Sequence, residues 1–102
     1  SQLAGENGEI TGTYMKELGF NVNFAPVADV ITKEEYLKDE KNRISGTRSF
    51  GWEPELVADY VSAYVTKLQA QGVSTVLKYF PGQGYLKDDP IKYPAQTCES
   101  AV

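Results

Sequence analysis

The residues best suited to chemistry lie where one strand-like run ends. Lys78 and Tyr79 come near the close of the run from Val73 to Phe80, which is rich in β-branched and aromatic residues. A Pro-Gly-Gln-Gly turn at residues 81–84 and an acidic loop reaching Asp89 follow directly. In α/β folds, ligand sites are commonly built from side chains at the carboxyl end of a strand and the loop that follows. We therefore expect residues 74–89 to form one rim of such a site.

Two further charged positions are candidates for the same site. Asp29 follows the run from Phe20 to Pro26, in which apolar and polar residues alternate as in a strand. Arg48 lies in an irregular stretch, Arg43 to Gly51, inside a connection of about twenty residues, and connections of that length are usually functional. Each residue also has a plainer interpretation, as a turn or cap aspartate and as a solvated surface charge.

Composition argues against several classes of site. The chain has 102 residues, a net charge of -4 and a pI near 4.7, and its basic residues are scattered. Nucleic acids and anionic membranes are bound by clustered Lys and Arg, so we expect neither as a partner. Histidine is absent, which removes the usual zinc ligand and the Ser-His and Cys-His couples, and the single cysteine, Cys98, cannot form an internal disulfide. We expect no metal and no cofactor.

Hydropathy and the first residues bear on the setting of the chain. No apolar run reaches about 18 residues and no signal-peptide pattern is present, so we expect no membrane span, and the compartment, cytoplasmic or secreted, stays open. The composition fits one domain or less. The sequence opens at Ser1 without an initiator methionine, and we expect an internal piece of a longer polypeptide.

Two helices and two strands would position these residues. Helical spacing of apolar residues predicts a helix from Leu3 to Leu18, in which three glycines could allow close approach to a sheet. A stronger apolar stripe predicts a helix from Glu53 to Gln71, with Pro54 suited to its first turn. Gly19 and Gly72 are natural stops for the two helices. A helical turn is predicted at residues 34–39, and residues 88–102 are expected to be loop.

The order of the elements determines the fold class. Helix, strand, connection, helix and strand imply parallel strands joined by a crossover helix, which is an α/β fold. Two parallel strands cannot bury both faces of a sheet by themselves. We therefore expect further chain, or other copies of this chain, to complete the sheet.

Three blocks of the sequence carry a family resemblance, and their order and spacing make it specific. They are ELGFNVNFAPVADV (Glu17 to Val30), RSFGWEPELVADYVSAYV (Arg48 to Val65) and KYFPGQG (Lys78 to Gly84). Together they resemble the N-terminal (β/α)8 barrel domain of family 3 glycoside hydrolases, and the β-N-acetylhexosaminidase branch most. Such a barrel has about 250 residues, so the resemblance implies that residues 1–102 are an incomplete barrel domain with no second domain.

The resemblance implies roles position by position. Asp29 is similar to the family aspartate that accepts hydrogen bonds from sugar hydroxyls, and Arg48 to the arginine that reaches the substrate. Lys78 matches the lysine that also binds the sugar at the non-reducing end, the glycone. Charged donors and acceptors aimed at hydroxyls form directional, charge-assisted hydrogen bonds. The substrate-binding set is therefore expected to be Asp29, Arg48 and Lys78, with Tyr79 assisting.

This sequence departs from the family at three histidine positions. Tyr79 and Gln83 stand where the family has the histidines of its K-H-F-P-G-H-G block. The hexosaminidase branch then carries an Asp-x-His acid/base pair, and here Asp89 falls on the aspartate and Ile91 on the histidine. Asp89 is thus a possible remnant of the acid/base loop, and no catalytic residue is expected in this segment. The family nucleophile lies on a later strand, beyond residue 102.

Three functional hypotheses follow from the resemblance. In the first, the chain belongs to a retaining glycosidase that cleaves β-N-acetylhexosaminides or β-glucosides and supplies residues that bind the sugar. In the second, favoured by the missing histidines, it belongs to an inactive carbohydrate-binding relative. In the third, the isolated chain is an inert structural fragment. Under the first two, the partner is a carbohydrate, and the rest of the barrel or self-association completes the fold.

Overall fold

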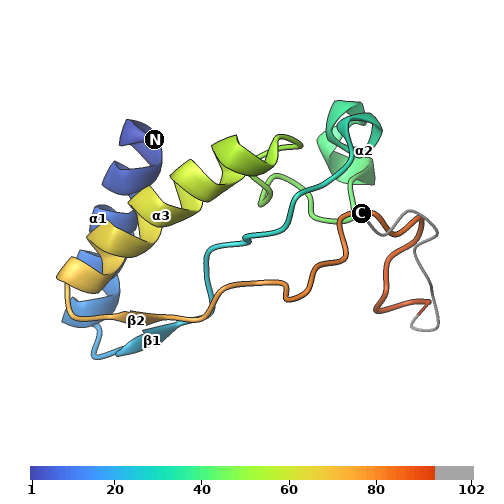
Figure 1. Cartoon of the computed structure of the whole chain (residues 1–102). Coiled ribbons are helices and arrows are strands. Elements are labelled where there is room, and N and C mark those ends of the chain that lie inside the picture. The colour runs from blue at the N-terminus through green and yellow to red at the C-terminus, as the bar shows by residue number, and fades with distance from the viewer. Residues whose placement is uncertain (94–102) are drawn as a thin grey trace.

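The computed structural model describes residues 1–93, and Cys98 lies outside the described residues. The predicted helices are present within one residue or two of their expected bounds, with Pro54 opening the second (Figure 1). Gly19 and Gly72, with φ of +87° and +82°, end them as expected. In chain order the elements are α1 (Gln2–Glu17), β1 (Val22–Asn23), α2 (Lys33–Leu37), the 3-10 helix η1 (Glu40–Asn42), α3 (Pro54–Ala70) and β2 (Ser74–Thr75).

The two strands are parallel neighbours, which confirms the expected α/β fold with a crossover helix. Their predicted lengths, residues 20–26 and 73–80, were wrong, because the regular ladder pairs only Val22 with Ser74 and Asn23 with Thr75. An isolated bridge then joins Val27 to Lys78. Three residues lie between Asn23 and Val27 while two lie between Thr75 and Lys78, so the first strand carries one extra residue. Such a bulge interrupts the ladder and re-aims the strand that follows it.

Helix α1 packs against helix α3, and the predicted close approach to a sheet is therefore wrong (Figure 1). Its buried residues are Gly5, Gly8 and Gly12. A Cβ built on Gly8 would lie 2.3 Å from the backbone carbonyl oxygen of Tyr64, closer than any side chain allows. The glycines let the two helix backbones touch, and Tyr64 and Leu68 of α3 are buried beside them with Val73.

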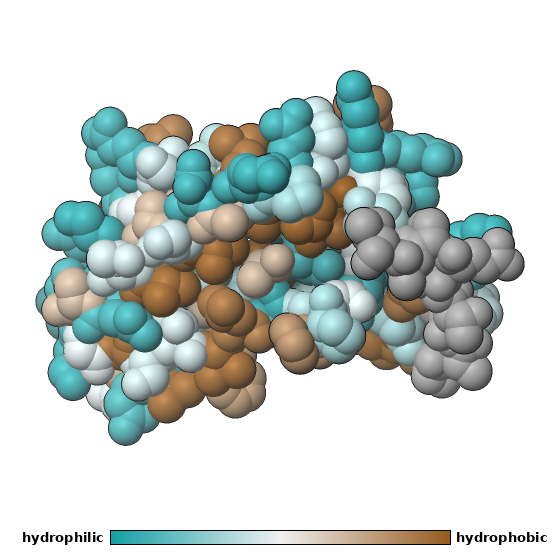
Figure 2. All heavy atoms as spheres, viewed as in Figure 1, coloured by the Kyte–Doolittle hydropathy of each residue, from teal (hydrophilic) through white to brown (hydrophobic). Residues whose placement is uncertain are grey.

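The large apolar residues of α1 lie on the surface, except Met15, which packs partly buried against the core. Ile10 and Tyr14 are both 67% exposed, and Phe24 and Phe80 near the strands are 66% and 97% exposed. Figure 2 shows hydrophobic residues gathered over the part of the molecule where β1 and β2 lie. Within residues 1–93, these exposed side chains do not belong to the core cluster of Tyr64, Leu68 and Val73. A search of the same residues finds no helix with the length and hydrophobicity of a membrane span.

Candidate functional site

Backbone pairing brings the first and third sequence blocks together. The Lys78 amide donates to the carbonyl oxygen of Pro26 at 3.0 Å, and the Ala28 amide donates to the carbonyl oxygen of Lys78. Asp29 and Tyr79 therefore each follow a residue of this paired segment, at the same end of two parallel strands. Lys78 itself is partly buried and takes part in this pairing through its backbone. This is the carboxyl edge at which parallel α/β folds bind ligands.

Asp29 is 8% exposed and holds the glycine-rich turn. Its Oδ2 accepts a hydrogen bond from the Gln83 amide at 2.8 Å. Gly82 has a φ of +124°, and a Cβ on Gly84 would lie 2.0 Å from the carbonyl oxygen of Val30, so both positions require glycine. The turn interpretation of this aspartate thus has a concrete form, because its carboxylate ties the third block to the first.

Arg48 links the second block to the third. It is exposed, its Nε donates to the carbonyl oxygen of Ser45 at 3.0 Å, and its Nη1 donates to the hydroxyl of Tyr79 at 3.2 Å. The hydroxyl of Ser49, next in the chain, donates to the carbonyl oxygen of Asp29 at 3.2 Å. The guanidinium and the tyrosine hydroxyl therefore stand beside the segment that carries Asp29.

A small cavity of about 10 Å³ lies beneath these residues. Its lining includes Asp29, Glu35, Ser45, Tyr79 and Gln83. Among the residues that the structure describes, the buried Oγ of Ser45 has no hydrogen-bond partner, so it adds a polar group to this space.

A larger hollow, about 570 Å³, lies elsewhere, between the first residues of α1, the middle of α3 and Phe50. It contains none of the candidate residues and is lined largely by apolar groups. A choice of site by cavity volume alone would therefore miss the edge where the three sequence blocks meet.

Asp89 sits in a turn of its own making. Its Oδ1 accepts from the Ile91 amide at 2.9 Å, and its carbonyl oxygen accepts from the amides of Lys92 and Tyr93 at 3.0 and 2.9 Å. This is the local pattern that aspartate forms in turns. A remnant of an acid/base loop stays a prediction for this residue.

Sequence reasoning missed the residues that support Arg48. Glu35, which is 7% exposed, accepts from the Ile44 amide at 2.8 Å and pairs with Lys38 at 2.5 Å between Oε2 and Nζ. A usable signal was present, because Thr32 precedes Glu35 by three residues, the spacing of a capping box. The Glu35 amide does donate to the Thr32 hydroxyl, at 3.1 Å.

The charges around Glu35 set its ionisation. Burial raises the pKa of its carboxyl group, but hydrogen bonds from Lys38 and Ile44 and the charges of Lys38 and Arg43 outweigh burial, so the pKa lies below its ordinary value. The pKa of Lys38 is raised, first by its hydrogen bond to Glu35, against a smaller lowering by burial. Within residues 1–93, no group of three or more His, Cys, Asp or Glu residues is placed to hold a metal ion.

Comparison with known proteins assigns the family. A sequence model described as "Glycosyl hydrolase family 3 N terminal domain" matches residues 1–97. The chain is 41% identical over 73 residues to Beta-hexosaminidase LpqI of Mycobacterium tuberculosis, covering 72% of this chain and 17% of that protein. It is 32% identical over 87 residues to a Beta-hexosaminidase of Stenotrophomonas maltophilia, covering 85% and 24%.

Solved structures agree in fold. The structure of M. tuberculosis LpqI superposes with a TM-score of 0.74 at 38% identity, covering 86% of this chain and 24% of that one. A family 3 β-N-acetylglucosaminidase from Paenibacillus gives 0.68 at 37% identity, covering 81% and 15%. The chain thus spans about a quarter or less of these relatives. Its parallel strands and crossover helix superpose on part of their TIM-barrel-like N-terminal domain. By the match over residues 1–97, this chain belongs to glycosyl hydrolase family 3.

Proposed function

We propose that residues 1–102 are an incomplete barrel domain of a retaining β-glycosidase and supply part of its glycone site. The substrate class is a non-reducing terminal β-N-acetylhexosaminide, with β-glucosides second. The names of the similar hexosaminidases support this choice. Within the chain, the hydrogen bond from Arg48 to Tyr79 supports it most, because it joins two sequence blocks beside Asp29.

The proposed binding residues have complementary chemistry. Arg48 and Lys78 are cationic donors, Asp29 is an anionic acceptor, and the Tyr79 hydroxyl can do both. Tyr79 accepts from Arg48 and so keeps its own proton for a sugar oxygen. Hydrogen bonds to charged groups contribute about 1.5–3 kcal/mol each, and a site built from them rejects sugars that lack the matching hydroxyl.

The covalent chemistry is assigned to residues outside this chain. A retaining glycosidase needs a nucleophilic carboxylate about 5–5.5 Å from its acid/base carboxyl group. Asp29, whose Oδ2 accepts the Gln83 amide, is assigned to binding. The isolated 102 residues are accordingly expected to have no hydrolytic activity.

A second function is supported by the three substituted histidine positions. Tyr79, Gln83 and Ile91 stand where the hexosaminidase branch has histidine, and isoleucine cannot transfer a proton. A relative that binds sugars without cleaving them would keep Asp29, Arg48 and Lys78 and tolerate these changes.

Mechanism-based labelling separates the two functions. The whole protein that carries this chain is incubated with a 2-fluoro β-glycoside and with aryl β-N-acetylglucosaminides. A retaining enzyme forms a covalent adduct visible by mass spectrometry and turns over the aryl glycoside. Neither adduct nor turnover, with retained affinity for N-acetylglucosamine, would establish the binding relative instead. A whole protein with neither hydrolytic activity nor affinity for N-acetylglucosamine would refute both functions.

A further inference from the structure

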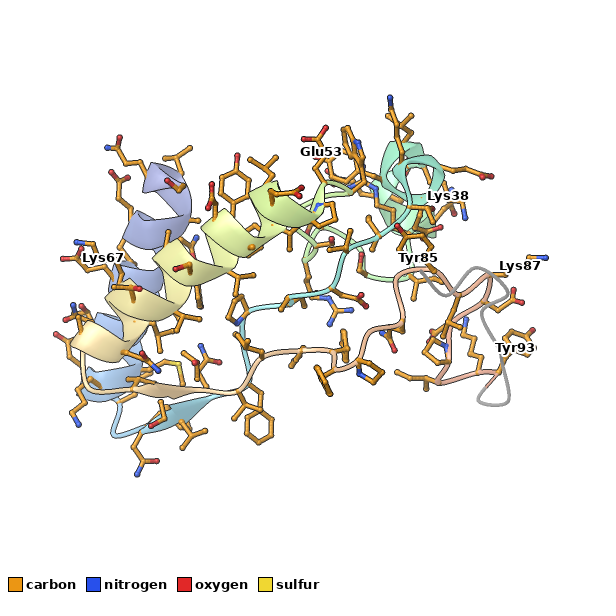
Figure 3. The ribbon with its side chains drawn as sticks, viewed as in Figure 1. Lys38, Glu53, Lys67, Tyr85, Lys87 and Tyr93 are labelled. Atoms are coloured by element: carbon orange, nitrogen blue, oxygen red, sulfur yellow. The ribbon has the colours of Figure 1, made fainter. Side chains whose placement is uncertain are left out.

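The connection between β1 and α3 is organised by the short helix α2. Thr32 caps it, and the buried carboxylate of Glu35 reaches across nine residues to accept the Ile44 amide at 2.8 Å. The other carboxylate oxygen pairs with Lys38, the residue that directly follows α2 (Figure 3). One side chain thus anchors a segment that has almost no regular secondary structure.

Side-chain contacts between Arg43, Tyr36 and Trp52 also hold this segment. Arg43 Nε donates to the carbonyl oxygen of Lys38 at 3.0 Å, and its guanidinium lies 4.7 Å from the centre of the Tyr36 ring. The Tyr36 ring in turn meets Trp52 edge-on at 4.6 Å between ring centres. These contacts hold residues 43–52 against α2.

The segment held by Glu35 is the one that orients Arg48. The carbonyl oxygen of Ser45, the residue after Ile44, accepts both the Arg48 amide at 3.2 Å and Arg48 Nε at 3.0 Å. With Nε fixed there, the planar guanidinium directs Nη1 to the Tyr79 hydroxyl at 3.2 Å. Glu35 also lines the small cavity that Asp29 and Tyr79 line.

We propose that Glu35 is a positioning residue for the sugar-binding arginine. It holds Ile44 through the Ile44 amide, and the carbonyl oxygen of the next residue, Ser45, holds the Arg48 guanidinium in the direction of Tyr79. Arg48 is exposed and would otherwise sample many rotamers, and ordering such a side chain on binding lowers affinity. The inference rests on the proposed function, because it takes Arg48 as a residue that contacts the sugar.

Three substitutions and a matched control separate positioning from general stability. Glu35→Ala removes the acceptor of the Ile44 amide and the partner of Lys38. Glu35→Gln keeps the size and an acceptor oxygen, so it should retain most of the effect on Arg48. Arg48→Ala removes the positioned group. Glu34→Gln, on the exposed neighbouring position of α2, neutralises a carboxylate of the same type and should change nothing.

A measurement without sugar tests the positioning directly. In the whole protein, the Nε–Hε signal of Arg48 is followed by ¹⁵N NMR and its solvent exchange rate is compared among the variants. We expect exchange about tenfold faster in Glu35→Ala than in the wild type, with Glu35→Gln close to wild type, because loss of one hydrogen bond to a charged group is of that order. Unchanged exchange in a folded Glu35→Ala protein overturns the proposal. If Glu35→Ala does not fold, Glu35→Leu replaces it under the same criterion. The proposal is also overturned if the Arg48 Nε–Hε group of Glu35→Gln exchanges as fast as an arginine of an unfolded chain.

A double-mutant cycle with N-acetylglucosamine tests the consequence for binding. Glu35→Ala should weaken affinity about tenfold alone and have no further effect in an Arg48→Ala background. An equal effect in both backgrounds would mean that Glu35 acts through general stability, which overturns the inference. Unchanged affinity in Arg48→Ala, with wild-type binding intact, refutes instead the proposed role of Arg48 in the glycone site, while the exchange measurement still decides the positioning.

Discussion

Asp29 shows how one carboxylate can serve both the fold and the site. Its Oδ2 holds the Gln83 amide and thereby shapes the turn that follows Tyr79. A carboxylate has about four acceptor positions, so this one bond does not exhaust it. Replacing Asp29 would disturb the turn and the site together, and loss of sugar binding in such a variant could not be assigned to contact with the sugar. Lys78 and Glu35 allow cleaner tests at this scale.

Lys78→Ala should lower the affinity of the whole protein for N-acetylglucosamine by about 10- to 100-fold, because it removes one charge-assisted hydrogen bond. Only the Lys78 backbone takes part in the strand pairing, so the fold should persist. Isothermal titration calorimetry gives the dissociation constant. Lys87→Ala is the control, since Lys87 is exposed and points away from the body of the molecule in Figure 3. Equal affinity of both variants would remove Lys78 from the site.

The lowered pKa of Glu35 predicts an acid-side loss of stability. A group whose folded pKa is depressed contributes stability above its ordinary pKa, here 4.5, and loses it as the pH falls through the folded value. The difference in unfolding free energy between wild type and Glu35→Gln should therefore be largest near neutrality and shrink below about pH 4.5. Urea unfolding from pH 7 to pH 3 measures it. A difference that does not change with pH would contradict the assigned contacts.

At the scale of elements, α1 packs on α3 through a face that carries no side chains. Three glycines at spacings of three and four fall on one face of the helix, so a groove without side chains receives the other backbone. The same residues cost helix propensity, which close packing has to offset. Lys67 of α3 reaches Glu9 of α1 at 3.6 Å on the exposed rim, a pair that contributes little (Figure 3).

Gly8→Ala and Gly5→Ala should therefore have opposite effects. At Gly8 the added methyl group meets backbone atoms of Tyr64, and forced separation of the helices costs about 1–3 kcal/mol. At Gly5 the nearest atom is 3.4 Å away on the flexible Lys67 side chain, so the gain in helix propensity, up to about 1 kcal/mol, should prevail. Chemical unfolding of the two variants checks the sign of each change. A neutral Gly8→Ala would show that the helices lie farther apart.

At the scale of the molecule, the surface near the strands carries large apolar side chains of the kind that protein interiors contain. Several large apolar side chains of α1 and of the strand segments, Ile10, Phe24 and Phe80 among them, are exposed, and the two paired strands leave both edges of the described sheet free. The chain spans about a quarter or less of its relatives' length, so the proposed occupant of this surface is the remainder of the barrel.

The isolated 102 residues should consequently self-associate. Sedimentation velocity across micromolar concentrations should show species larger than a monomer, and Ile10→Lys combined with Phe80→Lys should reduce them, because both side chains are exposed parts of this surface. Leu37→Lys is the control, since Leu37 is equally exposed, at 69%, but lies on α2. A monomeric wild-type chain would show that the exposed residues do not drive association.

Local signals in the sequence determined the two long helices and their ends at Gly19 and Gly72, because these depend on residues within about one helical turn of each other. The order of the elements along the chain then predicted parallel strands, because a crossover helix joins them. The sequence also carried the three family blocks and the candidate set of Asp29, Arg48, Lys78 and Tyr79. It did not predict where the ladder breaks, since the single extra residue before Val27 has no local signature.

Tertiary structure alone decided which face of α1 is buried, what Asp29 and Arg48 contact, and that Glu35 lies behind Arg48. Apolar spacing favoured the Ile10 and Tyr14 side of α1, yet the glycine face packs on α3, because contact distance between backbones depends on the partner helix. The bond from Arg48 to Tyr79 spans 31 residues and that from Gln83 to Asp29 spans 54. Contacts of such separation depend on strand register and chain crossing, and rules that compare near neighbours cannot supply them.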